Sequence, residues 1–228
     1  MAMKVAEMIE KVKNLIGGLK RDQRIVVLVR HGDKDEGEPK DTINATAKKA
    51  ARLLGARLRK AGLIIMKVIS SPRGRAAYTA LEVATGNTNA DEAVMPLTTD
   101  QQITDVSSER PDLVPILKEF MAGSNVKTVE EALLVCPDST VQEYSWQKAN
   151  AYKRAIVTRC RMKNGEHGPI MFVVHGGPLD IAIALMKQPL ATCLTDLRRP
   201  EKWIPKGGCT ILVIDENTGA VVNEKRLF

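Results

Sequence analysis

The sequence contains few aromatic residues and few histidines. Only 4% of its 228 residues are aromatic, and three are histidines. Aliphatic side chains must therefore fill most of the core, and a base-stacking surface for nucleic acid is disfavoured. No uninterrupted apolar run approaches the roughly 18 residues that a membrane-spanning helix needs. We therefore expect neither a nucleic-acid partner nor a membrane association.

Several common motifs are also missing. The four cysteines, Cys136, Cys160, Cys193 and Cys209, form no Cys-x-x-Cys pair, which excludes a zinc ribbon and favours free thiols in a reducing compartment. Charged residues such as Glu7 and Glu10 interrupt the apolar residues of the amino terminus, unlike a signal peptide. These features predict a cytoplasmic protein. A phosphate-binding P-loop and a dinucleotide-binding glycine motif are both absent, which disfavours nucleotide kinases and dehydrogenases.

The composition is otherwise that of a globular protein with an excess of positive charge. Hydrophobic residues make up 44% and charged residues 27%, and 34 basic against 27 acidic residues give a net charge of +7. The length suits one large domain or a domain with a substantial insertion. The charge favours anionic partners, which include phosphorylated metabolites and phosphoproteins.

Hydrophobic periodicity predicts the order of the elements. Residues 1–24 contain an amphipathic helix that docks on the main domain or on a second copy of the chain, so a homo-oligomer is possible. Residues 25–228 form the main domain, with a helical insertion near 106–165. We expect strands at 25–29, 64–69, 93–95 and 170–174, helices near 44–61, 73–84, 114–121, 143–162 and 179–186, and a closing hairpin at 209–214 and 220–223. Alternating strands and helices predict an α/β fold of three layers, helix/sheet/helix, with a mostly parallel central sheet.

Two of the predicted strands end in a histidine followed by glycine. One runs into Arg30-His31-Gly32 and the other into His175-Gly176-Gly177, while Ser70-Ser71-Pro72-Arg73-Gly74-Arg75 follows the strand between them. Because ligands bind outside the carboxyl ends of strands in an open α/β sheet, these groups are expected to converge. Arginines, histidines and glycine amides suit the oxygens of a phosphoryl anion.

These segments, in this order, resemble the histidine phosphatase superfamily, which includes the cofactor-dependent phosphoglycerate mutases. The resemblance rests on Leu28-Val29-Arg30-His31-Gly32, on Ile43-Asn44-x-x-Ala47, on Ser70-Ser71-Pro72-x-x-Arg75-Ala76 and on Val174-His175-Gly176-Gly177-Pro178. It covers roughly residues 25–215 and implies a phosphoglycerate mutase-like fold.

The resemblance also implies roles for individual residues. His31 is expected to be the nucleophile that becomes phosphorylated, and Arg30, Arg75 and His175 are expected to bind the phosphate, with His175 also taking part in catalysis. The spacing favours Arg75 over Arg73 as the pocket arginine. A neutral imidazole offers a lone pair near physiological pH, so no metal ion or other cofactor is expected.

The proton donor is harder to assign. Aligning Ile103 with the family's apolar residue puts Asp105 at the acid position, where glutamate is commoner, and leaves Asp100 and Glu109 as alternatives. The remaining histidine, His167, is expected to lie on the surface.

The expected function is metal-independent hydrolysis of a phosphomonoester through a phosphohistidine, on a small phosphorylated molecule or a phosphoprotein. The acidic segment after His31 and the region around Asp105 lack features of the mutases, which favours hydrolysis over phosphate relocation. A phosphoglycerate mutase-like phosphotransferase and a phosphate-binding regulatory module with little turnover remain as alternatives. Substrate choice is expected to depend on residues 106–165, where Lys148, Arg154 and Trp146 either contact the substrate or support the fold.

Overall fold

The structure is a computed structural model that describes residues 5–33, 41–89, 97–161, 168–187 and 204–227. Along the chain it contains α1 (Val5–Gly17), β1 (Gln23–Arg30), α2 (Ala45–Lys60), β2 (Lys67–Ser70), α3 (Gly74–Asn87), β3 (Leu97–Thr99), η1 (Gln101–Ile103), α4 (Val106–Glu109), α5 (Leu113–Ala122), α6 (Val129–Val135), α7 (Ser139–Cys160), β4 (Ile170–Val174), α8 (Pro178–Lys187), β5 (Cys209–Asp215) and β6 (Val221–Leu227). The predicted α/β architecture is confirmed.

The described strands form one sheet in the order β3-β2-β4-β1-β5-β6. The first four strands of that order run parallel to one another, and β5 and β6 are antiparallel to their neighbours. In the register of the sheet, Arg30 of β1 lies opposite Val174 of β4, and Ser70 of β2 lies opposite Val173. The ends of β1, β2 and β4 therefore meet at one edge, as the sequence predicted.

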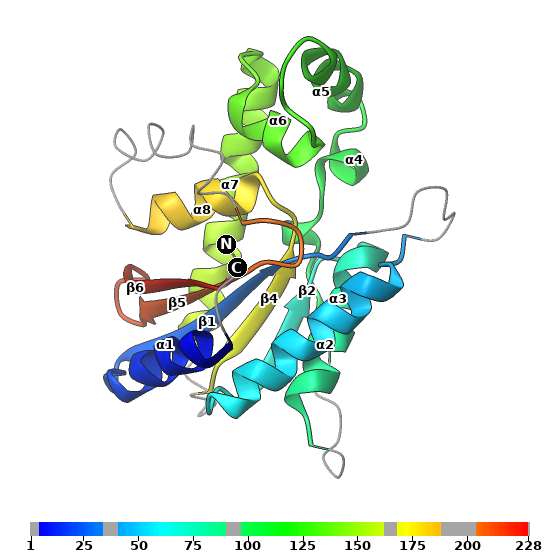
Figure 1. Cartoon of the computed structure of the whole chain (residues 1–228). Helices are drawn as coiled ribbons and strands as arrows, with labels where there is room; N and C mark the ends of the chain where they lie inside the picture. The colour runs from blue at the N-terminus through cyan, green and yellow to red at the C-terminus, as the bar shows by residue number, and fades with distance from the viewer. Residues whose placement is uncertain (1–4, 34–40, 90–96, 162–167, 188–203, 228) are drawn as a thin grey trace.

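The sheet is covered on both faces, which makes the three layers (Figure 1). Successive side chains of a strand point to opposite faces. Accordingly, Val27 and Val29 pack in a cluster with residues of α1, α2 and α3, whereas Val26 and Leu28 pack in a second cluster with residues of α7 and α8. The uninterrupted apolar run of β1 is thus explained by burial on both faces.

A third apolar cluster lies outside the three layers. It joins residues of α4, α5, α6 and the start of α7, and Figure 1 shows α4, α5 and α6 grouped beyond one end of the sheet. Helices α4, α5 and α6 fall within residues 106–165, where the sequence predicts a helical insertion, and we refer to this region as the insertion. The amino-terminal helix α1 docks on the main domain through Met8, Val12 and Leu15.

Among the described helices, none combines the length and the apolar character that crossing a bilayer requires.

Local signals explain most element boundaries. Asn44 caps α2 by accepting a hydrogen bond from the amide of Ala47 at 2.7 Å. Asp138 caps α7, which therefore begins at Ser139 rather than near residue 143, because the side chain of Asp138 accepts from Thr140 and Val141. The strand predicted at 93–95 lies outside the described residues, and β3 begins directly after them at Leu97.

Candidate active site

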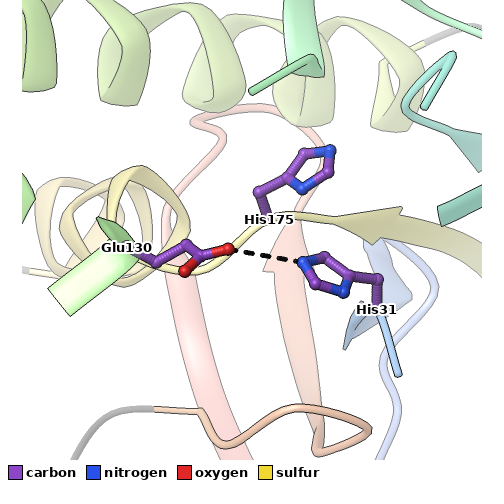
Figure 2. A group of neighbouring side chains, drawn as sticks. All are labelled: His31, Glu130 and His175. Atoms are coloured by element: carbon purple, nitrogen blue, oxygen red, sulfur yellow. Dashed lines mark ion pairs between the residues drawn. The ribbon is translucent and has the colours of Figure 1, made fainter. Parts of the chain in front are cut away.

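The two histidines at the strand ends lie side by side. The ring centroids of His31 and His175 are 4.9 Å apart, and both side chains are almost completely buried. Figure 2 shows the two rings with the carboxylate of Glu130 beside them. Segments separated by most of the domain therefore converge on one small volume.

Backbone hydrogen bonds fix this convergence. The amide of His31 donates to the carbonyl of Val174 at 3.0 Å, and the amide of Ser71 donates to Val173 at 3.0 Å. The amide of Gly32 donates to Oγ1 of Thr79 at 3.0 Å, and that hydroxyl donates to the carbonyl of Arg75 at 2.7 Å. The sheet and the first turns of α3 thus hold the histidines and Arg75 in fixed relative positions.

The glycines after His175 are required by the packing. A Cβ at Gly176 would lie 2.7 Å from Cζ of Arg30, so only glycine lets this arginine pack against the backbone. Gly177 has a φ of +73°, a conformation that favours glycine, and leads into α8.

The hydrogen bonds of His31 distinguish its two ring nitrogens. Nδ1 lies 2.8 Å from the carbonyl oxygen of Gly32, an arrangement that requires a proton on Nδ1. In the neutral ring the lone pair is then on Nε2, which accepts a hydrogen bond from Nε of Arg75 at 3.2 Å. Oε1 of Glu130 lies 3.5 Å from the same nitrogen. Nε2 is therefore the nitrogen that faces the pocket.

His175 is held neutral and has one free nitrogen. Its Nε2 lies 2.8 Å from Oγ of Ser71, which also accepts from the amide of Arg73. Nδ1 has no hydrogen-bond partner among the described residues and faces His31 (Figure 2). Burial, and then the charges of His31 and Arg75, keep the pKa of His175 well below its usual range. A bound dianion would favour the protonated ring.

The two arginines of the segment after β2 form a network with two carboxylates. Arg75 donates through Nη1 to Asp41 at 3.2 Å and through Nη2 to Asp105 at 2.7 Å. Nε of Arg73 lies 3.2 Å from Asp41 and 3.3 Å from Asp105. Arg75 is the arginine that reaches His31, as the spacing favoured, while Arg73 is more exposed.

Arg30 points to the same pocket from the end of β1. Its Nη1 donates to the carbonyl of Ile204 at 2.9 Å, and its Nη2 lies 3.7 Å from Oε2 of Glu130. Nε and Nη2 are buried without a hydrogen-bond partner among the described residues. Buried donors without partners are costly, so this guanidinium has capacity for an anion.

Glu130 is a pocket residue that the sequence did not reveal. It lies in the first turn of α6, inside the insertion. Burial alone would raise its pKa, but the interaction with His31 and the charge of Arg30 outweigh burial, so the pKa lies well below the usual range. The only signal in the sequence was an acidic first turn after Thr128, a helix-capping pattern that gives no hint of a site.

The three carboxylates considered as proton donors lie in different surroundings. Asp105 lines the cavity beside His31, and its Oδ1 also caps α4 by accepting from Ser108. Asp100 caps η1 and pairs with Arg159, and Glu109 pairs with Lys148 and accepts from Tyr144. Among the described carboxylates, only Asp105 and Glu130 line this cavity.

The hydroxyl of Tyr152 helps to place Asp105. It donates to the carbonyl of Ile103 at 3.1 Å and to that of Thr104 at 3.2 Å, and so fixes the backbone of the two residues before Asp105. This ring is completely buried on α7, so the position of Asp105 depends on the packing of the insertion against the sheet.

The other candidate residues of the insertion do not line the cavity. Lys148 is buried and pairs with Glu109, and Trp146 packs against the cluster on the α7 and α8 face of the sheet. Arg154 lines a different depression, beside the hairpin. Of the three, Lys148 and Trp146 support the fold. His167 lies outside the described residues.

His31, Glu130 and His175 could in principle hold a metal ion, since one ligand atom from each lies within 4.8 Å of the others. However, the pocket also holds the guanidinium groups of Arg30 and Arg75, which repel a cation. Arg75 contacts His31, and Arg30 contacts the carboxylate of Glu130. The charge distribution suits an anion better than a metal ion.

Comparison with known proteins agrees with this geometry. The family model of the histidine phosphatase superfamily (branch 1) matches residues 26–224. The chain belongs to this superfamily. No curated protein sequence matches it.

Solved structures with this fold include several phosphatases, all of low sequence identity. A mycobacterial glucosyl-3-phosphoglycerate phosphatase is 14% identical, with a TM-score of 0.55 over 90% of this chain and 97% of that one. A putative alpha-ribazole-5'-P phosphatase from Escherichia coli is 18% identical, with a TM-score of 0.54 over 90% and 95%. The protein histidine phosphatase SixA, complexed with tungstate, is 13% identical, with a TM-score of 0.53 over 90% and 94%. These likenesses establish the shared histidine phosphatase fold.

Proposed function

We propose that this histidine phosphatase superfamily member hydrolyses phosphomonoesters through a phosphohistidine formed on Nε2 of His31. The observation that carries the proposal is the set of buried, unpaired polar atoms around that nitrogen. Nε and Nη2 of Arg30 and Nδ1 of His175 have no hydrogen-bond partner among the described residues. Together with Arg75 they match the oxygens of a phosphoryl group placed next to Nε2 of His31.

The reaction proceeds in two steps. In the first, Nε2 of His31 attacks phosphorus, a P–N bond forms, the P–O ester bond breaks, and the leaving oxygen takes a proton from a carboxylic acid. In the second, water loses a proton to the same carboxylate and attacks phosphorus, so the P–N bond breaks and phosphate is released. Arg30, Arg75 and His175 stabilise the charge that spreads over the phosphoryl oxygens.

Asp105 is the carboxyl group that we propose as proton donor. It lines the cavity, and the ion pairs with Arg73 and Arg75 fix its position next to the phosphoryl site. General acid–base assistance of this kind contributes roughly 10²- to 10⁴-fold. Glu130 lies 3.5 Å from His31 but occupies the space beside Arg30 that phosphoryl oxygens need, so we assign it a different role, as an internal competitor for the anion site.

The direct test is hydrolysis of 4-nitrophenyl phosphate in the presence of a chelator. Activity that persists in chelator and is lost in the His31→Ala variant supports the proposal, as does an acid-labile, base-stable phosphoenzyme trapped by rapid quenching. Full activity of the His31→Ala variant would refute it. An exposed control, such as Lys60→Ala at the end of α2, should leave activity unchanged.

One alternative has a specific observation in its favour. Glu130 lies within 3.5 Å of Nε2 of His31 and Asp105 is bound by two arginines, an arrangement that also suits a phosphate-binding regulatory module with little turnover. Stoichiometric phosphate binding without hydrolysis of any ester would favour that module. Isomerisation of phosphoglycerate primed by a bisphosphoglycerate would instead identify a mutase-like phosphotransferase.

A further inference from the structure

The cavity beside His31 has two chemically different ends. It has a volume of about 340 Å³, and His31, Arg75 and His175 line its polar end. The opposite wall comes from helices α4, α5 and α6 of the insertion. Its aliphatic side chains are Val106, Val114, Met121, Val129 and Leu133, and we call this set the aliphatic wall.

The aliphatic wall is part of the packed structure. Val106 and Leu133 are each only 4% exposed and belong to the third apolar cluster, and Met121 and Val129 pack against that cluster. Their positions are therefore set by core packing rather than by chance exposure on a surface. An apolar surface inside a concave site, next to a few convergent polar groups, is typical of a ligand pocket.

The wall offers little to a polyhydroxylated ligand. The hydroxyl groups on the cavity lining belong to Thr104, Ser107, Thr128 and Tyr152. Oγ1 of Thr128 already accepts from the amide of Glu131 at 3.2 Å, and the hydroxyl of Tyr152 already donates to the carbonyls of Ile103 and Thr104. Sugar hydroxyls placed against the aliphatic wall would lose their water without gaining partners from its five side chains, which is unfavourable.

We propose that the cavity takes small phosphomonoesters whose alcohol part is apolar, either alkyl or aryl, in preference to esters of sugars or glycerate. This inference rests on the proposed function for the reaction, and on the aliphatic wall for the chemistry of the ester. The volume is at the low end for ligand pockets, which suits a small body. His31 is only 3% exposed, so the phosphoryl group must enter the cavity completely. A small ester enters more easily than a phosphorylated side chain of a folded protein.

The test uses n-alkylphosphonates from methyl to hexyl, in which a P–C bond replaces the ester bond so that nothing is hydrolysed. Binding to the wild-type protein is measured by isothermal titration calorimetry. Affinity should rise about two- to fourfold for each added methylene until the cavity is filled, because each methylene leaves water. Propylphosphonate should bind at least about fivefold more tightly than 2,3-dihydroxypropylphosphonate, which has the same length. In turnover, hexyl phosphate should exceed glucose 6-phosphate in kcat/KM.

A matched pair of variants tests the wall itself. Val114→Thr and Val129→Thr keep the side-chain shape but add a hydroxyl, and should reduce hexylphosphonate affinity at least about threefold while leaving methylphosphonate affinity unchanged. The control is Ile116→Thr, since Ile116 lies on α5 like Val114 but is exposed outside the cavity. Circular dichroism confirms that the variants fold.

The outcomes separate this inference from the proposed function. Equal affinity along the alkyl series, or an equal loss in the Ile116→Thr control, would overturn the inference. More efficient hydrolysis of a phosphopeptide than of hexyl phosphate would also overturn it. A rise in affinity with chain length in a protein that hydrolyses no ester would support the apolar pocket and refute the hydrolytic function.

Discussion

Replacing Glu130 by glutamine should make the protein bind inorganic phosphate more tightly. In the structure its carboxylate lies 3.5 Å from Nε2 of His31 and 3.7 Å from Nη2 of Arg30, where it takes contacts that phosphoryl oxygens would otherwise make. Its lowered pKa means that it is ionised throughout the neutral range. Phosphate must therefore either displace this side chain or bind next to its negative charge.

The size of the effect follows from these contacts. At an effective dielectric constant of 20, two unit charges 4 Å apart interact by about 4 kcal/mol. A net hydrogen bond to a charged group is worth roughly 1.5–3 kcal/mol. Glu130 is mostly buried, but its two contacts are longer than ideal hydrogen bonds, so the lower end of the hydrogen-bond range, about 1.5 kcal/mol, is the appropriate guide. We expect the Glu130→Gln variant to bind phosphate roughly 10-fold more tightly, with an upper bound of about 100-fold.

The assay is calorimetric titration of phosphate into the wild-type, Glu130→Gln and Glu131→Gln proteins at pH 7. Glu131 is a suitable control because it is the next residue of α6, does not line the cavity beside His31, and accepts a hydrogen bond from the amide of Lys127. The control should bind like the wild type. Unchanged or weaker phosphate binding by the Glu130→Gln variant would refute the competition between Glu130 and phosphate.

Three further predictions follow from the same surroundings. Asp105→Asn should lower hydrolysis of an alkyl phosphate roughly 10²- to 10⁴-fold but that of 4-nitrophenyl phosphate much less, because a good leaving group needs no proton; equal losses would exclude Asp105 as the donor. The affinity for sulfate, which does not titrate between pH 5 and 8, should fall as the pH rises through this range. The reason is that the pKa of His175 is lowered in the empty pocket, so the ring must take up a proton to pair with the anion. A pH-independent affinity would contradict this role of His175. Complete burial raises the pKa of Asp180 from 3.8 to about 6, so the free energy of unfolding should decrease as the pH rises through that window. In urea unfolding, Asp180→Asn should therefore stabilise the protein by up to roughly 3 kcal/mol at pH 8 and little at pH 4. Equal effects at both pH values would argue against the raised pKa.

Much of the fold and half of the site were readable from local sequence. The run Ile25–Val29 is apolar without alternation, which requires burial on both faces, and the strand 170–174 has the same character. Because parallel strands present their carboxyl ends at one edge, Arg30, His31 and His175 were expected together, and the structure brings them together. The preference for Arg75 over Arg73 came from the resemblance to the histidine phosphatase motif, and Arg75 is the one that contacts His31.

The carboxylates could not be assigned in the same way. Asp100, Asp105 and Glu109 are close in sequence and chemically alike, yet capping turns and ion pairs with Arg159 and Lys148 direct the outer two away from the cavity. Two other carboxylates come from segments without a recognisable motif: Glu130 lines the cavity, and Asp41 binds Arg75. The strand named at 93–95 falls on residues that the structure does not describe.

The sequence by itself determined the parts of this protein that depend on short-range rules: burial of β1 and β4, the helix that Asn44 caps, and the histidines at the strand ends. Only the tertiary structure decided which charged side chains contact His31 and which side chains form the opposite wall of its pocket. The reason is physical. The orientation of α6, and with it the positions of Glu130 and the aliphatic wall, is set by packing among helices of the insertion, and long-range packing of this kind has no local periodic signature.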